Sequence, residues 1–90
     1  MFNVLDVFYL TNNKRKNIMN NFSLKEFGEK LKYLRKEAGI GQNQLAEYLN
    51  ISNASVSYWE TGKQIPSAEA IYKIAVFFNI SADYLLGIKE

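Results

Sequence analysis

Twenty residues in the middle of the chain constrain its fold more than any other stretch. Residues 42–61 read QNQLAEYLNISNASVSYWET. Their apolar side chains recur at helical spacing, at Leu45, Ala46, Leu49, Val56 and Trp59. This spacing predicts two short amphipathic helices, over 42–49 and 53–60. Only three residues connect them, so the second helix must fold back against the first.

The connection between these helices has the chemistry of a tight reversal. Asn50 stands where the first helix must end, and Asn follows only Gly in tolerating the left-handed backbone typical of such an end. Ser52 can cap the second helix, because its hydroxyl can accept a hydrogen bond from an amide of the first turn. Ala46 is expected to face the crossing helix, where a longer side chain would force the two axes apart.

Three further helices are expected around this pair. The first follows Ser23, which forms the S-x-x-E pattern of a capping box with Glu26, and it ends at Gly39. The second begins after a cap at Ser67 and the third after a cap at Ser81. The buried stripes of the first two are expected to hold Leu24, Phe27, Leu31, Leu34 and Ala38, and Ile71, Ile74, Ala75 and Phe78.

The stretch around Asn50 resembles the helix-turn-helix of the lambda-type repressor and Cro family, also called XRE-type. The matching positions are Gln42, Ala46, Asn50 (usually Gly in the family), Ile51, Ser52, Val56 and the W-E-x-G-K sequence of residues 59–63. The similarity continues to F-G-E-K-L-K-Y-L-R at 27–35 and to I-S-A-D-Y-L-L-G at 80–87. The resemblance implies an all-α, five-helix, lambda-repressor-like DNA-binding domain over 23–87, with its helix-turn-helix at 42–61.

The two ends of the chain fall outside this resemblance. Residues 1–22 are expected to be an N-terminal extension, in which 2–10 could form a short strand and 11–21 reads as a polar linker. Three interpretations stay open: an arm that pairs with a second subunit or reaches DNA, an appendage without a role, or translation that starts at Met19. Residues 88–90 are expected to be a C-terminal tail.

Composition excludes several classes of function. The chain has no Cys and no His, which excludes disulfides, thiolate metal sites and imidazole catalysis. We find no nucleophile-and-base set and no phosphate loop, so we expect no enzyme, no metal and no cofactor. No apolar run approaches the length of a membrane span, and no membrane partner is expected.

The charge of the folded part is balanced. The chain has a formal net charge of +2, but residues 23–87 contain seven basic and seven acidic side chains. The excess comes from the three basic residues at 14–16. A nearly neutral domain predicts few ion pairs with phosphates and a shallow salt dependence of DNA binding.

The resemblance implies that the helix 53–60 reads bases in the major groove of double-stranded DNA. With Val56 and Trp59 turned inward, its outward face presents Asn53, Ala54, Ser57 and Tyr58. Asn53 could pair with adenine through two hydrogen bonds, and Ala54 could touch a thymine methyl group. The alternative is that Asn53 merely starts the helix and Tyr58 covers neighbouring apolar surface.

Contacts to DNA phosphates are expected from Gln42, Asn43, Ser52, Ser55 and Lys63. Gln42 matches the phosphate-contacting Gln of the family, although an exposed residue at a helix start would look the same. Gly41 departs from the family, which usually has Thr or Ser as the cap of this helix.

Two further expectations concern stability and assembly. The resemblance implies a partly buried ion pair between Arg35 and Glu60; otherwise Arg35 is a solvated residue that complements the helix dipole. It also implies a homodimer, with Leu85 and Ile88 at the interface.

We therefore predict a cytoplasmic, nucleoid-associated regulator of bacterial or phage origin. It would be a sequence-specific DNA-binding transcriptional repressor that binds a roughly palindromic operator. A regulatory protein is a possible second partner. The alternative is an antitoxin-like or adaptor module that uses the same fold to bind protein. The neutral domain and the lack of Arg and Lys in 53–60 favour this alternative.

Overall fold

The computed structural model describes residues 22–88, and these residues form five helices without a strand. The helices are α2 (Leu24–Glu37), α3 (Gln42–Leu49), α4 (Asn53–Glu60), α5 (Ala68–Phe78) and α6 (Ala82–Leu86). The prediction of an all-α, five-helix domain is confirmed for this part of the chain. The strand and linker expected before Phe22 lie outside the described residues, as do the last two residues of the tail.

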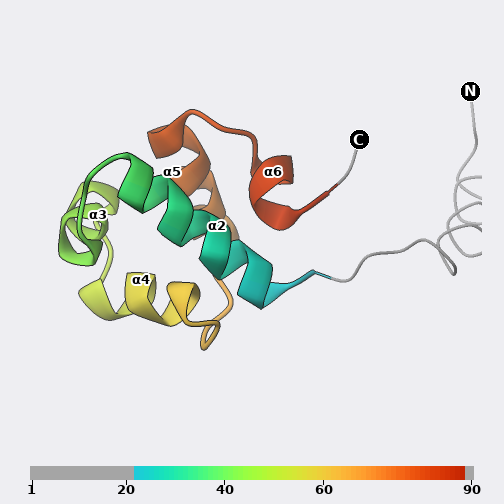
Figure 1. Cartoon of the computed structure of the whole chain (residues 1–90), viewed down its shortest axis with the longest axis horizontal. Coiled ribbons are helices and arrows are strands. Elements are labelled where there is room, and N and C mark those ends of the chain that lie inside the picture. Colours follow the sequence, from blue (N-terminus) through green and yellow to red (C-terminus); the bar gives the residue numbers. More distant parts are fainter. Residues whose placement is uncertain (1–21, 89–90) are drawn as a thin grey trace, which may run out of the picture.

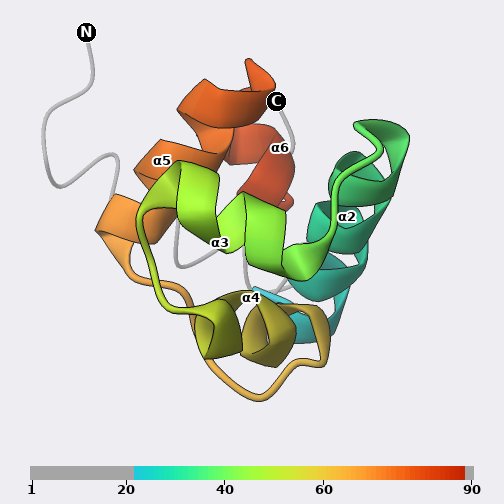
Figure 2. The same cartoon turned by 90° about the vertical axis from the view of Figure 1, so that its left-hand side faces the viewer.

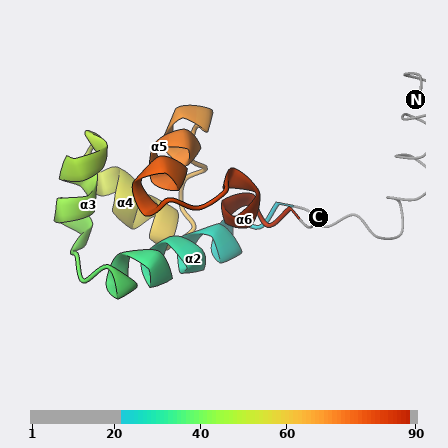
Figure 3. The same cartoon turned by 90° about the horizontal axis from the view of Figure 1, so that it is seen from above.

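α3 and α4 lie at one end of the domain, and α2 and α5 connect them to α6 at the other end (Figures 1 and 2). α4 lies against both α3 and α2, while α5 packs on α3 and α6. Seen from above, α2 runs along one side of the domain, and α6 closes the end opposite α3 (Figure 3). None of these helices is both long and apolar enough to cross a bilayer.

A single apolar core joins all five helices. Its buried members are Phe27, Leu31, Leu45, Ala46, Leu49, Val56, Trp59, Ala70, Ile71, Ile74 and Leu85. The expected inward direction of Val56 and Trp59 is confirmed. The expectation for Ala38 is wrong, because it is the exposed C-cap residue of α2 and lies beyond the last turn of the stripe.

The helix ends use the caps that the sequence predicts. Four serines accept a hydrogen bond from the amide three residues later, and these serines are Ser23, Ser52, Ser67 and Ser81. Asn50 adopts the left-handed conformation, with φ 56° and ψ 51°, and Asn79 does the same after α5. These ends are set by hydrogen bonds between near neighbours, and they fix the length of the connection between α3 and α4.

Gly28 lets α2 approach the C-terminal end of α4. A Cβ atom at this position would collide with the carbonyl oxygen of Trp59 and would lie 2.9 Å from that of Glu60. Gly is a poor helix former, so its place inside α2 reflects this contact between backbones. The contact brings α2 next to the last turn of α4.

Candidate nucleic-acid interface

The outward face of α4 carries the side chains expected to read bases. Asn53 and Ala54 are exposed in the first turn, and Tyr58 is exposed one turn later. Ser57 is half-buried. The opposite face of α4 is held by α2 and α3 through Val56 and Trp59. This packing leaves a polar strip that is short enough to enter a groove of DNA.

Two serine hydroxyls meet at the start of α4. Ser52 Oγ lies 2.8 Å from Ser55 Oγ and accepts a hydrogen bond from the Ser55 amide at 3.3 Å. Two hydroxyls that share one hydrogen bond keep the second proton free. That proton can be donated to a phosphate oxygen, so the pair suits the expected phosphate contact.

The start of α3 is ordered by two glutamines. Gln44 Oε1 accepts a hydrogen bond of 2.8 Å from the amide of Gly41, the cap residue, which itself has no side chain to cap the helix. Gln42 is half-buried, and its Nε2 donates to Glu60 Oε1 at 3.0 Å. Asn43 is exposed. The expected phosphate contacts Gln42 and Asn43 therefore sit beside the C-terminal end of α4.

Lys63 follows the C-terminal end of α4. Its amide donates to the carbonyl oxygen of Tyr58 at 2.7 Å, and Gly62 before it has a φ of 71°. The residue itself is exposed. Backbone hydrogen bonding thus fixes where Lys63 leaves α4, while its ammonium group remains accessible to an anion.

Arg35 and Glu60 meet in a buried ion pair between α2 and α4. Arg35 Nε donates to Glu60 Oε2 at 2.7 Å, and Arg35 Nη2 donates to Glu60 Oε1 at 3.0 Å. Arg35 Nη1 also donates to the carbonyl oxygen of Ile40 at 2.9 Å. The hydrogen bond to Glu60 raises the pKa of Arg35 above its ordinary value, so the guanidinium stays charged.

The two residues expected at a dimer interface differ in exposure. Ile88 is 55% exposed, but Leu85 is only 1% exposed. The structure therefore corrects the expectation for Leu85, because its side chain is part of the core of this chain and offers no surface to another. Tyr84 in α6 is also exposed, at 44%.

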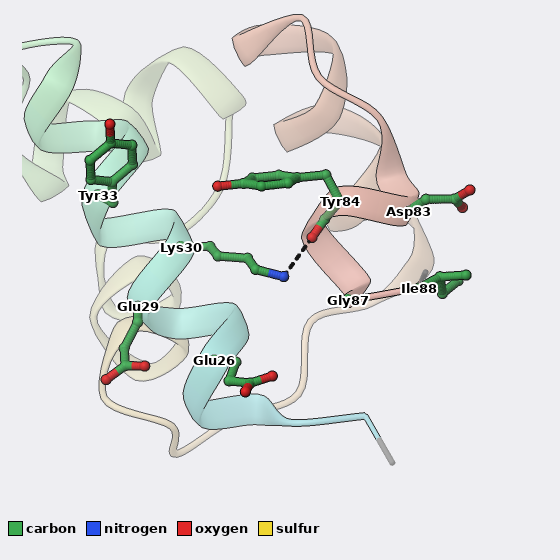
Figure 4. A pocket seen from close by; sticks show the side chains of 8 residues that line it. All are labelled: Glu26, Glu29, Lys30, Tyr33, Asp83, Tyr84, Gly87 and Ile88. Carbon is green, nitrogen blue, oxygen red and sulfur yellow. Dashed lines mark hydrogen bonds between the residues drawn. The ribbon is translucent and has the colours of Figure 1, made fainter. Parts of the chain in front are cut away.

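An open groove with a volume of about 770 Å³ lies between α2 and α6 (Figure 4). Lys30 reaches across it and donates to the carbonyl oxygen of Tyr84 at 2.7 Å. Its Nζ also lies 5.0 Å from the centre of the Tyr84 ring. The groove is lined by Glu26, Glu29, Lys30, Tyr33, Asp83, Tyr84, Gly87 and Ile88.

Sequence reasoning missed two features of this region. Gly28 could have been noticed as the only Gly between good helix formers in α2, which is a signal of close approach. The hydrogen bond from Gln42 to Glu60 had no local signal, because eighteen positions separate the two residues.

A comparison with protein families shows to which family the chain belongs. A family described as Helix-turn-helix matches residues 31–85. The chain belongs to the lambda-repressor-like helix-turn-helix family. Members of this family are DNA-binding transcription regulators and not enzymes.

Curated relatives agree with this assignment. The helix-turn-helix transcriptional activator BcrR of Enterococcus faecalis is 43% identical over 65 residues, which are 72% of this chain and 32% of BcrR. The regulator ImmR of Bacillus subtilis is 40% identical over 63 residues, which are 70% of this chain and 50% of ImmR. The chain thus spans at most half the length of these two relatives.

The solved structures include a repressor bound to DNA. The P22 c2 repressor in complex with a synthetic operator is similar with a TM-score of 0.64 and 32% identity. The match covers 67% of this chain and 91% of the P22 c2 chain. The similarity therefore extends over nearly the whole domain of that repressor.

Proposed function

We propose that this chain is a sequence-specific transcriptional repressor that binds double-stranded DNA as a homodimer. One observation carries the proposal: a short polar face of α4 stands free, with the N-terminal end of α3 beside it. A helix of this size enters the major groove, and residues near its N-terminus reach the base edges. The protein would act in the cytoplasm, on nucleoid DNA.

In this proposal the base contacts come from the exposed face of α4. Asn53 can donate to N7 and accept from N6 of an adenine, a pairing worth about 1–3 kcal/mol of discrimination. Ala54 is suited to a thymine methyl group. Tyr58 and Ser57 lie one turn further and reach a base or the sugar–phosphate backbone. α4 contains no Arg or Lys, so direct reading of guanine is not expected.

Phosphate contacts would hold the domain in register on either side of this helix. Gln42 and Asn43 lie at the start of α3, Ser52 and Ser55 at the start of α4, and Lys63 after its end. Such contacts position a protein without reading sequence. Only one of these five residues is cationic, which agrees with the balanced charge of the domain.

A homodimer would place two copies of α4 on one face of the duplex. Half-sites about 10 base pairs apart, and a roughly palindromic operator, follow from that symmetry. Ile88 and the neighbouring Tyr84 are exposed apolar side chains available for the contact between copies. The complex of the P22 c2 repressor with a synthetic operator supports DNA binding by similarity.

The proposal is tested by DNA binding with an Asn53→Ala variant. The wild-type chain would first select duplexes from a random-sequence pool, and fluorescence anisotropy would then measure affinity for the selected duplex. We expect Asn53→Ala to weaken binding about tenfold, close to 1.4 kcal/mol, and to relax the preference at one adenine. Tyr58→Ala would be compared with Tyr72→Ala, which removes an exposed ring on α5.

Two results would count against this function. One is a failure of the wild-type chain to enrich any sequence from the pool. The other is equal affinity of the wild type and Asn53→Ala for the selected duplex, which would remove α4 as the reading helix.

A second candidate function is an adaptor that binds a regulatory protein. It is favoured by an exposed aromatic pair on another face, where the rings of Tyr48 and Phe77 stack with centroids 5.4 Å apart. These residues are 61% and 40% exposed. A chain that acts only as an adaptor would enrich no sequence from the random DNA pool. Its affinity for the protein partner would be unchanged by Asn53→Ala and Tyr58→Ala.

A further inference from the structure

We propose that Glu60 is a positioning residue for DNA binding, which holds the Gln42 amide in place for a phosphate. This inference rests on the proposed function. It assigns the buried ion pair a second role: the pair joins α2 to α4, and through Glu60 it also reaches the first residue of α3.

The orientation of the Gln42 amide follows from hydrogen-bond chemistry. The Glu60 carboxylate is bound by Arg35 and can only accept, so the Gln42 amide must turn its nitrogen toward it. The distance between Gln42 Nε2 and Glu60 Oε1 is 3.0 Å. The amide nitrogen has two hydrogens, and this contact uses one. The second hydrogen remains for an anionic oxygen.

Arg35 makes this arrangement compatible with DNA. A lone carboxylate 3.0 Å from the Gln42 amide would repel a phosphate approaching the same group. Arg35 donates two hydrogen bonds to Glu60, so the pair carries no net charge. Glu60 can therefore hold the amide without opposing the phosphate.

Holding the side chain before binding should improve affinity. A free Gln side chain loses rotamer freedom when it is fixed in a complex, and this loss weakens binding. The contact to Glu60 fixes the side chain already in the free protein. Asn43 is the natural comparison, since it is exposed at the next position of α3 and forms no side-chain hydrogen bond within residues 22–88.

The test uses a background that removes Glu60 without leaving a buried charge. Arg35→Met with Glu60→Leu keeps the net charge, and replacing a whole buried pair by apolar residues is often nearly neutral for stability. DNA affinity would be measured for this double variant and for Gln42→Ala, alone and combined. The duplex would be the one that the wild-type chain selects from a random-sequence pool.

We expect the double variant to bind about three- to tenfold more weakly than the wild type. The factor by which Gln42→Ala weakens DNA binding should be at least about threefold smaller in the double variant than in the wild type. Asn43→Ala is the control. It should weaken DNA binding by the same factor in both backgrounds, because the effects of substitutions that share no contact are additive. A purely structural role of Glu60 would leave the effect of Gln42→Ala unchanged.

A measurement on the wild type keeps the proposal testable if the double variant fails to fold. Side-chain amide NMR relaxation should show Gln42 more restricted than Gln64, which is exposed in the loop after α4. Equal mobility of the two amides would overturn the positioning role. So would additive losses from Gln42→Ala and the double variant, while DNA binding by the wild type stays intact. Absence of wild-type binding would instead overturn the proposed function together with this inference.

Discussion

At the scale of single residues, two asparagines carry a backbone conformation that most side chains avoid. Asn50 ends α3 and Asn79 ends α5, with φ of 56° and 54°. The amide after each end reaches back into its helix: Ile51 donates to the carbonyl oxygen of Ala46, and Ile80 to that of Ala75. Gly is the usual residue at the first of these positions in the family, and Asn is the next best substitute.

Gly28 gives the sharpest prediction at this scale. We expect Gly28→Ala to lower the free energy of unfolding by about 1–3 kcal/mol, although Ala is the better helix former. The reason is the clash of the new Cβ with the carbonyl oxygens of Trp59 and Glu60. Urea unfolding would measure it, with Lys32→Ala on the exposed side of α2 as a control that changes stability by less than about 0.5 kcal/mol.

A stabilised Gly28→Ala variant would contradict this packing. It would mean that α2 can move away from the end of α4 at little cost, and that the helix preference of Ala then dominates.

At the scale of elements, one ion pair links α2, α4 and the start of α3. Arg35 donates hydrogen bonds to Glu60 and to the carbonyl oxygen of Ile40, while Glu60 is shared between Arg35 and Gln42. The side chains of Arg35 and Glu60 are only 10% and 3% exposed. Such a network is sensitive to the loss of one member, because the remaining charge stays away from water.

The prediction at this scale compares one-sided and two-sided replacement. We expect Glu60→Ala to cost about 3–5 kcal/mol of stability, since Arg35 would remain buried without its partner. The double variant Arg35→Met with Glu60→Leu should unfold near the wild type. Chemical denaturation measures both, and equal losses in the two variants would mean that the space between the helices, and not the stranded charge, decides the cost.

At the scale of the whole molecule, the balance of charge limits the number of ion pairs that the domain would form with DNA phosphates. Residues 23–87 carry equal numbers of acidic and basic side chains. Association with DNA through counterion release depends on the number of cationic contacts. Hydrogen bonds from amides and hydroxyls would then carry more of the positioning than is usual for a basic domain.

We expect the logarithm of the DNA association constant to fall only slowly with the logarithm of salt concentration. Lys63→Ala should reduce the magnitude of this slope by about 1 for each bound copy, because one phosphate contact is lost. Anisotropy titrations across a range of salt concentrations would measure it. The control is Lys32→Ala on α2, which should leave the slope unchanged; a steep slope that Lys63→Ala does not alter would place the cationic contacts elsewhere.

The sequence by itself determined the features that depend on near neighbours. Helical spacing around Leu45 and Val56, the serine caps and the reversal at Asn50 are local, because a hydrogen bond or a buried stripe within one turn sets each of them. The resemblance extended these local signals to the family, which the comparison then confirmed. The outward direction of Asn53 follows from the same spacing.

Only the tertiary structure decided the features that depend on how the helices cross. Leu85 is buried, Gly28 faces the backbone of α4, and Gln42 reaches Glu60. Each of these contacts joins residues from different helices, where a small change of crossing angle would move the partners out of reach. Periodicity specifies which face of a helix is apolar, but not which atom of another helix that face will meet.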